Sequence, residues 1–323
     1  MEQTEQPKIF VEKRVLIVPG RNSADLAARI ADASGYPLAK IEWTNFSDGE
    51  TKPQYQDNIR GATLYIVNST NAPASNLYDL LLLTDAAVRA SAEKVIAVIP
   101  YFGGQRQERK DKGRVPITAM LNVKLLEAAG VNKIIAMDLH ADAIQAFFPR
   151  FDHIYASAFF VPVIKNLGLE NLIFASPDIN GGKRAEKYAL YFKLGIAVCW
   201  KRRKDGVDQV EVTSLFGKVK GKNVVVFDDI LDTAGSLEGC VNLLVKAKAK
   251  TITVIVTHPM LSGKAYERIV NMPNVKCIVS DSLPLKEKFL TLQNIEVISS
   301  HPLLGEVIRR DVNNESISTL FAF

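Results

Sequence analysis

The sequence predicts an α/β protein built from two largely parallel sheets, and three observations support this. Eight short runs rich in apolar residues recur along the 323 residues, and helical patterns separate most of them. Most runs are almost continuously apolar, as expected for parallel strands that are covered on both faces. Strands that alternate with helices are typical of parallel sheets. The length is also about twice that of a common domain, so we expect two domains.

The candidate elements follow one another in a regular order. The predicted strands cover residues 15–20, 63–69, 95–101, 133–139, 172–178, 224–230, 251–258 and 276–281. The predicted helices cover residues 23–34, 76–91, 118–129, 181–193, 236–247 and 263–271. The strands divide four and four around a loop-rich stretch at 149–156. We therefore expect one domain at 1–155 and a second at 156–323, with the C-terminal tail able to pack back on the first.

Composition and charge describe an ordinary globular chain. The net charge of +5 is a mild excess that Lys and Arg could direct at phosphates, and it equally fits a slightly basic surface. The three cysteines are widely spaced and form no zinc pattern, so we expect buried thiols in a reducing compartment. No signal peptide is recognisable, and no apolar run reaches the ~18 residues of a membrane span. We therefore expect a cytoplasmic protein that binds no membrane.

Polar residues collect where several predicted strands end, which is where open parallel sheets bind ligands. The clearest segment is VVVFDDILDTAGS at 224–236, where a buried strand delivers Asp228 and Asp229 and a short loop leads into a helix. The N–H groups of a helix start can bind phosphate, and adjacent carboxylates can bind a sugar diol or a hydrated Mg²⁺. A simple N-capped helix is the alternative, but a cap does not require three aspartates within five residues.

This segment resembles the ribose-5-phosphate loop that phosphoribosyltransferases share with ribose-phosphate diphosphokinases. The resemblance implies that Asp228 and Asp229 face the ribose hydroxyls. It implies that the 5-phosphate is surrounded by Asp232, Thr233, Ala234, Gly235 and Ser236. Five further segments resemble the diphosphokinases, in that family's order, and the resemblance runs from about residue 8 to the C-terminus. The resemblance therefore implies two phosphoribosyltransferase-like domains, each a largely parallel sheet flanked by helices.

Two of these segments resemble ATP-binding parts of the family. NFSDGE at 45–50 matches a segment that contacts the adenine held by a neighbouring subunit, which implies this role for Phe46, Asp48 and Glu50. Without the family it is merely a polar turn. The basic loop at 100–119 matches the ATP loop.

The match at 100–119 implies that Arg106 and Gln107 contact ATP. Arg offers a planar fork of donors that suits a polyphosphate, although a solvated surface loop has the same composition. Gly104 and Gln105 stand where the family usually has Tyr-Ala, so we expect the local shape of this loop to differ from the family's.

The other three segments resemble metal-linked and catalytic parts. MDLHADAIQAFF at 137–148 and ASPD at 175–178 imply that His140 and Asp178 assist Mg²⁺. The basic stretch at 199–206 resembles the family's mobile catalytic loop and implies that Lys201 and Arg203 close over the phosphates. Mobile cations and Mg²⁺ are the machinery expected for phosphoryl-type transfer. Taken alone, a lone His after a strand is usually structural, and a basic stretch is usually a surface loop.

The resemblance implies a diphosphokinase of nucleotide biosynthesis, which transfers the diphosphoryl group of ATP to ribose 5-phosphate, and a homo-oligomer, often a hexamer. Two alternatives stay open: a non-catalytic regulatory homologue, and a phosphoribosyltransferase. Nucleic-acid binding is not expected, because the basic residues lie in two short loops without an aromatic series. Asp142, Ala143 and Met120 depart from the family's usual residues. A carboxylate at 142 would repel a regulatory phosphate, so we expect weakened control by phosphate and ADP.

Overall fold

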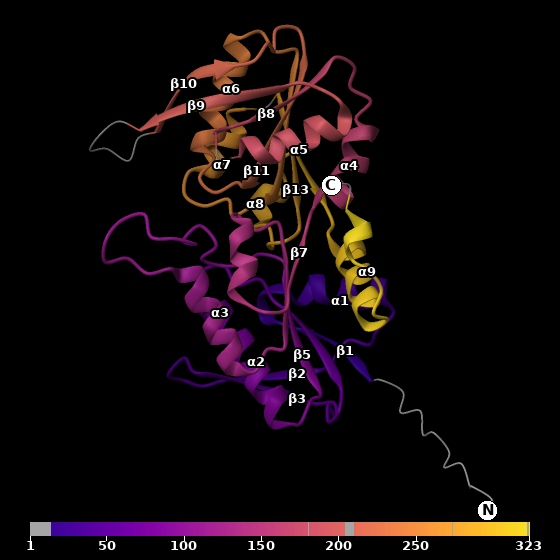
Figure 1. Cartoon of the computed structure of the whole chain (residues 1–323). Helices are drawn as coiled ribbons and strands as arrows, with labels where there is room; N and C mark the ends of the chain where they lie inside the picture. Colours follow the sequence, from indigo (N-terminus) through magenta and orange to yellow (C-terminus); the bar gives the residue numbers. More distant parts are fainter. Residues whose placement is uncertain (1–13, 180, 204–209, 273, 322) are drawn as a thin grey trace, which may run out of the picture.

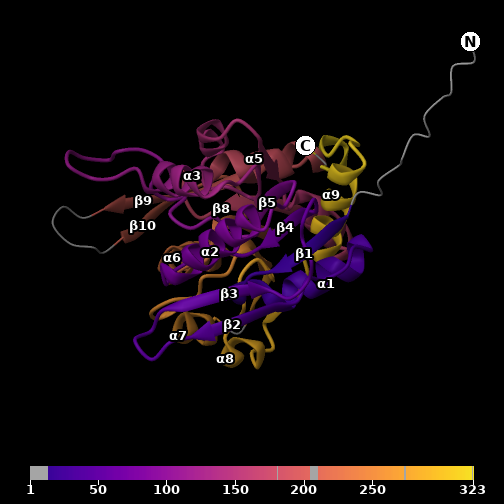
Figure 2. The ribbon, with the colours of Figure 1, turned by 90° about the horizontal axis from the view of Figure 1, so that it is seen from below.

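The structure, a computed structural model, describes residues 14–179, 181–203, 210–272, 274–321 and 323; for 201–203 and 210–213 it describes the backbone alone. Figure 1 shows two α/β lobes stacked end to end, with the C-terminal helix returning beside the first lobe. The same ribbon seen from below places the first lobe in front of the second (Figure 2). Each lobe is built on its own sheet, and these sheets position the polar loops that matter for function.

The first sheet has five parallel strands in the order β1-β4-β5-β6-β7. They are β1 (Val15–Pro19), β4 (Thr63–Val67), β5 (Lys94–Ile99), β6 (Lys133–Met137) and β7 (Phe151–Ile154). Its helical segments are η1 (Arg21–Ser23), α1 (Ala24–Ser34), α2 (Ser75–Arg89), α3 (Thr118–Ala129) and η2 (Asp142–Phe147). An antiparallel hairpin of β2 (Ile41–Asn45) and β3 (Thr51–Tyr55) projects from this lobe.

The second sheet has seven strands in the order β10-β9-β8-β11-β12-β13-β14, all parallel except the edge strand β10. They are β8 (Leu172–Ser176), β9 (Ile196–Arg203), β10 (Val210–Phe216), β11 (Asn223–Ile230), β12 (Thr251–His258), β13 (Val275–Ser280) and β14 (Ile295–Ile298). The helical segments are α4 (Ser157–Asn166), α5 (Gly182–Phe192), α6 (Gly235–Lys246), α7 (Ala265–Val270), α8 (Glu287–Leu290), α9 (His301–Val312) and η3 (Ser318–Leu320).

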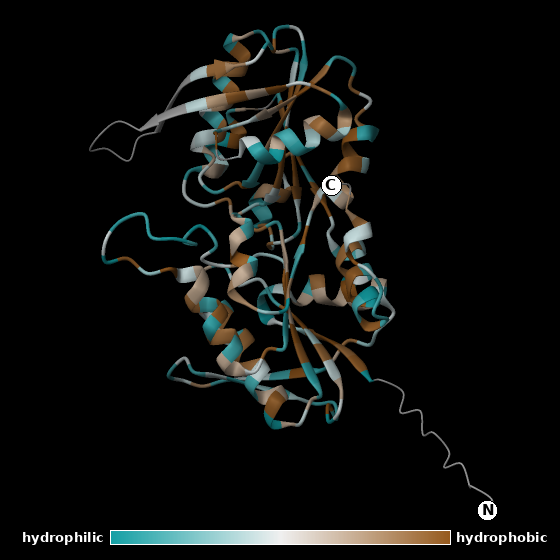
Figure 3. Ribbon diagram, viewed as in Figure 1, coloured by the Kyte–Doolittle hydropathy of each residue, from teal (hydrophilic) through white to brown (hydrophobic). Residues whose placement is uncertain are grey.

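The apolar strand runs form the core because helices cover them. Figure 3 shows hydrophobic strands inside each lobe and a hydrophilic loop ahead of α3. One apolar cluster holds residues of both lobes, among them Ile17 of β1, Phe160 of α4, Phe227 of β11 and Val307 of α9. Each such side chain stabilises the folded protein by about 1.5–3 kcal/mol when it is buried. Because the cluster contains residues of both lobes, it also holds the two sheets together.

The C-terminal helix α9 packs against α1 of the first lobe. A Cβ at Gly305 would come 2.8 Å from the Cβ of Ala33, so the two helices approach closely there. Asp311, near the end of α9, accepts hydrogen bonds from the hydroxyl of Tyr65 (2.7 Å) and the ammonium of Lys133 (2.6 Å). Both partners lie on strands of the first sheet, so α9 is tied to that lobe by charge as well as by packing.

The predicted α/β class, all eight predicted strands and all six predicted helices are confirmed within a few residues. The stretch at 149–156 was expected to be loop, and it instead contains β7. The basic stretch at 199–206 was also expected to be a loop, and its first half, up to Arg203, is strand β9. No helix in the described part of the chain is both long and apolar enough to cross a membrane.

Candidate active site

The loop at 228–236 joins β11 to α6 and contains every residue predicted to bind ribose 5-phosphate. Ala234 precedes the helix with φ +60°, a left-handed conformation that costs a residue with a Cβ about 1–2 kcal/mol. No described side chain caps the start of α6. The first N–H groups of the helix can therefore donate hydrogen bonds to a ligand, and the helix dipole favours an anion there.

Neighbouring segments hold this loop from outside. The carboxylate of Asp232 accepts a short hydrogen bond from the hydroxyl of Ser262, whose own N–H donates to the Asp232 carbonyl (3.0 Å). The guanidinium of Arg268 donates to the Thr233 carbonyl (2.7 Å) and pairs with Glu238 (3.0 Å). The loop is thus shaped before any ligand arrives, which lowers the entropy that binding would otherwise cost.

The two adjacent carboxylates occupy different electrostatic environments. Burial alone would raise the pKa of Asp229, but Arg184 (3.2 Å) and His140 (2.6 Å) outweigh it and hold this pKa well below its usual range. Burial, and then the charge of Asp229, raises the pKa of Asp228 well above its usual range. A nearby cation or hydroxyl donors would stabilise the ionised carboxylate and lower this pKa. Asp228 is therefore suited to a ligand that brings such groups.

His140 joins the first lobe to this carboxylate pair. Its Nδ1 lies 2.6 Å from Asp229, and its backbone N–H donates to the side-chain oxygen of Gln105 (2.9 Å). The hydrogen bond with Asp229 raises the pKa of His140. Because Nδ1 is engaged, Nε2 is the atom through which His140 could bind a metal, and only in the neutral ring.

Asp178 lies at the carboxyl end of β8, beside Asp228. Its Oδ1 accepts the N–H of Gly181 (2.8 Å), and its charge contributes to the raised pKa of Asp228. Among the described residues, no three His, Cys, Asp or Glu side chains converge on one metal position. His140 and Asp178 would suit a Mg²⁺ ion whose other ligands are waters and substrate phosphates, because Mg²⁺ often takes few ligands from the protein.

The loop between β5 and α3 reaches the loop at 228–236 across the two lobes. The guanidinium of Arg106 forms an ion pair with Asp232 (2.9 Å), while Gln107 accepts a short hydrogen bond from Thr118. Gly103 is required, because a Cβ there would lie 1.9 Å from the carbonyl oxygen of Thr70. The residues predicted for ATP and for ribose 5-phosphate therefore meet at Arg106 and Asp232.

Comparisons with known proteins agree with this geometry. Residues 15–130 match the N-terminal domain of ribose phosphate pyrophosphokinase, and residues 207–322 match the phosphoribosyl synthetase-associated domain. A ribose-phosphate pyrophosphokinase from Chlorobaculum tepidum is 44% identical over 313 residues, which are 96% of each chain. This chain belongs to the ribose-phosphate pyrophosphokinase family.

Further relatives support the assignment to the ribose-phosphate pyrophosphokinase family. The pyrophosphokinase of Bacillus subtilis is 39% identical over 97% of this chain and 99% of its own. The crystal structure of phosphoribosylpyrophosphate synthetase from Mycobacterium smegmatis matches with a TM-score of 0.87 at 31% identity, covering 94% of this chain and 100% of that one. The resemblance seen in the sequence is confirmed, and so is the expected class of activity, that of a diphosphotransferase enzyme.

Three of the predicted ATP residues lie apart from the rest of the site. Phe46, Asp48 and Glu50 form the turn of the β2–β3 hairpin, and the Phe46 ring is 47% exposed. Among the described residues, no hydrogen bond or ion pair joins them to Arg106 or to the loop at 228–236. Figures 1 and 2 show the hairpin turn, the loop before α3 and the far ends of β9 and β10 on one side of the molecule.

The backbones of Lys201 and Arg203 lie on β9, opposite Val212 and Val210 of β10. Their side chains, and the segment at 204–209, lie outside the described residues. The structure therefore places the strand that carries the predicted catalytic cations, while the position of their charges stays a prediction.

Sequence reasoning missed two residues that shape the site of this chain. Arg184 of α5 pairs with Asp229 and donates to the Leu139 carbonyl (3.4 Å), next to His140. Asp138 is buried with φ +40°, accepts the N–H of Ala156 (3.1 Å) and accepts a short hydrogen bond from Thr257 of the second lobe. The pattern of Lys183-Arg184 at a helix start gave no hint of an ion pair with a distant carboxylate.

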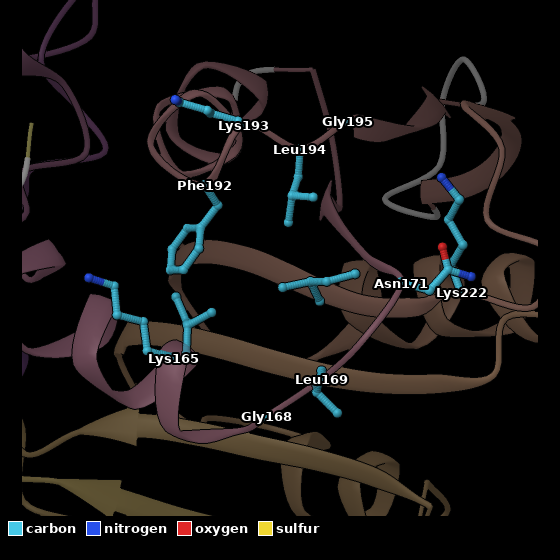
Figure 4. A pocket seen from close by; sticks show the side chains of 11 residues that line it. Lys165, Gly168, Leu169, Asn171, Phe192, Lys193, Leu194, Gly195 and Lys222 are labelled. Carbon is cyan, nitrogen blue, oxygen red and sulfur yellow. The ribbon is translucent and has the colours of Figure 1, made fainter.

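A surface pocket of about 490 Å³ lies elsewhere, at the amino ends of β8, β9 and β11. Its floor includes Phe192 and Leu169, and in Figure 4 the ammonium groups of Lys165, Lys193 and Lys222 point away from it. Ligands of open parallel sheets bind at the carboxyl ends of the strands, where the carboxylates described above lie. We therefore place the active site at the carboxyl ends and not in this pocket.

Proposed function

We propose that this chain transfers the diphosphoryl group of ATP to the 1-hydroxyl of ribose 5-phosphate, which gives 5-phosphoribosyl 1-diphosphate and AMP. The observation that carries the proposal is the pair of contacts across the lobes, Arg106 with Asp232 and His140 with Asp229. They bring a loop suited to a polyphosphate against a loop suited to a sugar phosphate. A phosphoribosyltransferase would need only the second loop.

The site residues divide the work by their chemistry. The N–H groups at the start of α6 hold the 5-phosphate, and Asp228 and Asp229 accept hydrogen bonds from the ribose diol. Asp229 stays ionised beside Arg184, so it accepts throughout, while the hydroxyl donors of the ribose would stabilise the ionised form of Asp228.

Arg106 supplies the polyphosphate contact. It is more than half exposed and pairs with Asp232 in the described state, so phosphate oxygens can replace the carboxylate at small cost. The ribose 1-hydroxyl then attacks the β-phosphorus in line with the departing AMP. Lys201 and Arg203 stabilise the charge that develops on the transferred oxygens.

A magnesium ion bound to the nucleotide phosphates would neutralise charge and orient the diphosphoryl group. His140 through Nε2 and Asp178 through its carboxylate are the residues we assign to it. Because the described residues form no three-ligand cluster, we expect the metal to arrive with ATP.

The exposed turn with Phe46, Asp48 and Glu50 supports a homo-oligomer, a hexamer by resemblance, in which this turn contacts adenine bound to a neighbouring copy. We also propose a cytoplasmic location and no nucleic-acid or membrane partner. Asp142 lies 3.4 Å from His153 and is mostly exposed, so it would repel a phosphate bound nearby. Weakened control by phosphate and ADP therefore stays our prediction.

The test is AMP formation from ATP and Mg²⁺, with and without ribose 5-phosphate. We expect AMP only with the sugar phosphate, and loss of it in Lys201→Ala. Lys222→Ala is the matched control, because it removes the same charge at the opposite end of β11 and should act like wild type. If the wild type makes no AMP over a range of phosphate concentrations, the regulatory homologue is the better description.

A further inference from the structure

Two of the three cysteines are in contact in the second lobe. Cys199 lies on β9 and Cys240 on α6, and both side chains are fully buried. Their sulfur atoms are 2.7 Å apart. Non-bonded heavy atoms attract best at about 3.5–4.0 Å, and a disulfide bond measures about 2.04 Å. The separation of the two sulfurs therefore lies between the length of a disulfide bond and the distance of an ordinary packing contact.

The surroundings favour reaction between these two thiols and no other. Cys240 shares the buried face of α6 with Leu237, Val241 and Leu244, and this face packs under the edge of the sheet formed by β9 and β10. Cys277 lies on β13, and three strands separate β13 from β9 in the sheet. At about 4.8 Å per strand this places Cys277 about 19 Å away, too far to bond with either partner.

We propose that Cys199 and Cys240 are an oxidisable dithiol that a hydroperoxide converts to an intramolecular disulfide. One sulfur attacks a peroxide oxygen and the O–O bond breaks. This cysteine becomes a sulfenic acid, and an alcohol leaves, or water when the oxidant is hydrogen peroxide. The second sulfur then displaces water from the sulfenic acid. Two thiols and one hydroperoxide thus give one disulfide, one alcohol and one water, and an external thiol reverses the change.

Access to the buried sulfurs depends on the edge of the sheet. β10 is the edge strand and β9 is its neighbour, so local opening of this pair exposes the dithiol without unfolding the lobe. A small oxidant fits through such an opening, whereas a protein-sized oxidant does not. In a reducing compartment a disulfide of this kind is transient and signals oxidation rather than adding permanent stability.

The consequence for catalysis rests on the proposed function. Cys199 lies two residues before Lys201, or about 7 Å along the strand, and Cys240 lies five residues into α6, or about 7.5 Å from its start. A bond between them ties the strand that carries the catalytic cations to the helix that begins at the phosphate loop. The positions of β9 and α6 relative to each other would then be fixed, and turnover would fall.

The first experiment counts thiols and maps the bond in the full-length protein treated with hydrogen peroxide. In denaturant, the wild type should fall from three reactive thiols to one. Peptide mass spectrometry should find the Cys199 and Cys240 peptides joined and lighter by two hydrogens. Cys277→Ala should fall from two thiols to none, and Cys199→Ala and Cys240→Ala should form no such species. A wild type that forms only intermolecular or Cys277-linked species overturns the proposal.

The second experiment measures AMP formation before and after oxidation. We expect turnover of the wild type and of Cys277→Ala to fall by at least about fivefold and to recover with dithiothreitol. Cys240→Ala should keep its rate. If the bond forms and the rate does not change, the link to catalysis is wrong. If no AMP forms at all, the proposed function fails, and the thiol count still decides on the dithiol.

Discussion

Replacing Arg184 with Gln should destabilise the protein in a pH-dependent way. Arg184 lies 3.2 Å from Asp229, whose side chain is 8% exposed, so the change leaves a buried carboxylate with fewer partners. Removing one member of a fully buried pair costs about 3–5 kcal/mol. Asp229 keeps His140 at 2.6 Å, and Arg184 is itself 23% exposed. We therefore expect the free energy of unfolding to fall by about 2 kcal/mol at pH 7.

The sign of the pH dependence follows from Asp229. Its pKa in the folded protein is held below the unfolded value of about 4, so the ion pair contributes fully above pH 4 and is lost as the pH falls through the folded pKa. The deficit of Arg184→Gln should thus be widest near neutral pH and should narrow below about pH 4. His140 and Arg184 are the partners of Asp229 that set this window.

Urea unfolding of wild type and variant, at one protein concentration because assembly contributes to stability, measures the deficit. Arg89→Gln is the control, because Arg89 forms an exposed pair with Asp85 and its loss should leave the urea midpoint unchanged. Arg184→Lys should recover part of the stability. The reasoning is refuted if Arg184→Gln and Arg89→Gln share a midpoint at pH 7, or if the deficit is the same at about pH 3 as at pH 7.

Three further changes test the site. Gly103→Ala should lose about 2 kcal/mol of stability, because its Cβ would lie 1.9 Å from the Thr70 carbonyl, whereas Gly113→Ala meets nothing within 4 Å and should unfold like wild type. Arg106→Ala should raise the KM for ATP about tenfold. It should change stability by less than about 1 kcal/mol, since the Arg106 side chain in this ion pair is more than half exposed; a large loss of stability with normal KM would contradict this. Removal of Mg²⁺ with EDTA should abolish AMP formation and leave the melting temperature unchanged, because the described residues form no three-ligand metal cluster; a fall in melting temperature would indicate a resident metal site.

The sequence predicted most of the fold because parallel strands covered on both faces are continuous apolar runs. VVVF before Asp228 is such a run, and β11 lies there. The missed strands lack this signal: β2 is half-exposed, and β14 has only four residues. Helix α4 contains Pro162 in its interior, which breaks the usual helical pattern.

Part of the candidate site could likewise be predicted from the sequence and part could not. Residues within one loop, such as those at 228–236, can be predicted together because covalent connection fixes their spacing. Arg106 and His140 were predicted as site residues, but their contacts with that loop could not be predicted, and Arg184 was missed, because the three reach the loop from different segments. Nor does any motif signal that Cys199 and Cys240, 41 residues apart, would meet.

By itself, the sequence determined the α/β class, the order of the strands along the chain and the chemistry offered at their carboxyl ends. These follow from local composition, since apolar runs must be buried and helix starts attract anions. Only the tertiary structure decided which of the two carboxylates has the lower pKa and which cation faces it. Those outcomes depend on distances of about 3 Å between groups far apart in the sequence, and packing alone sets such distances.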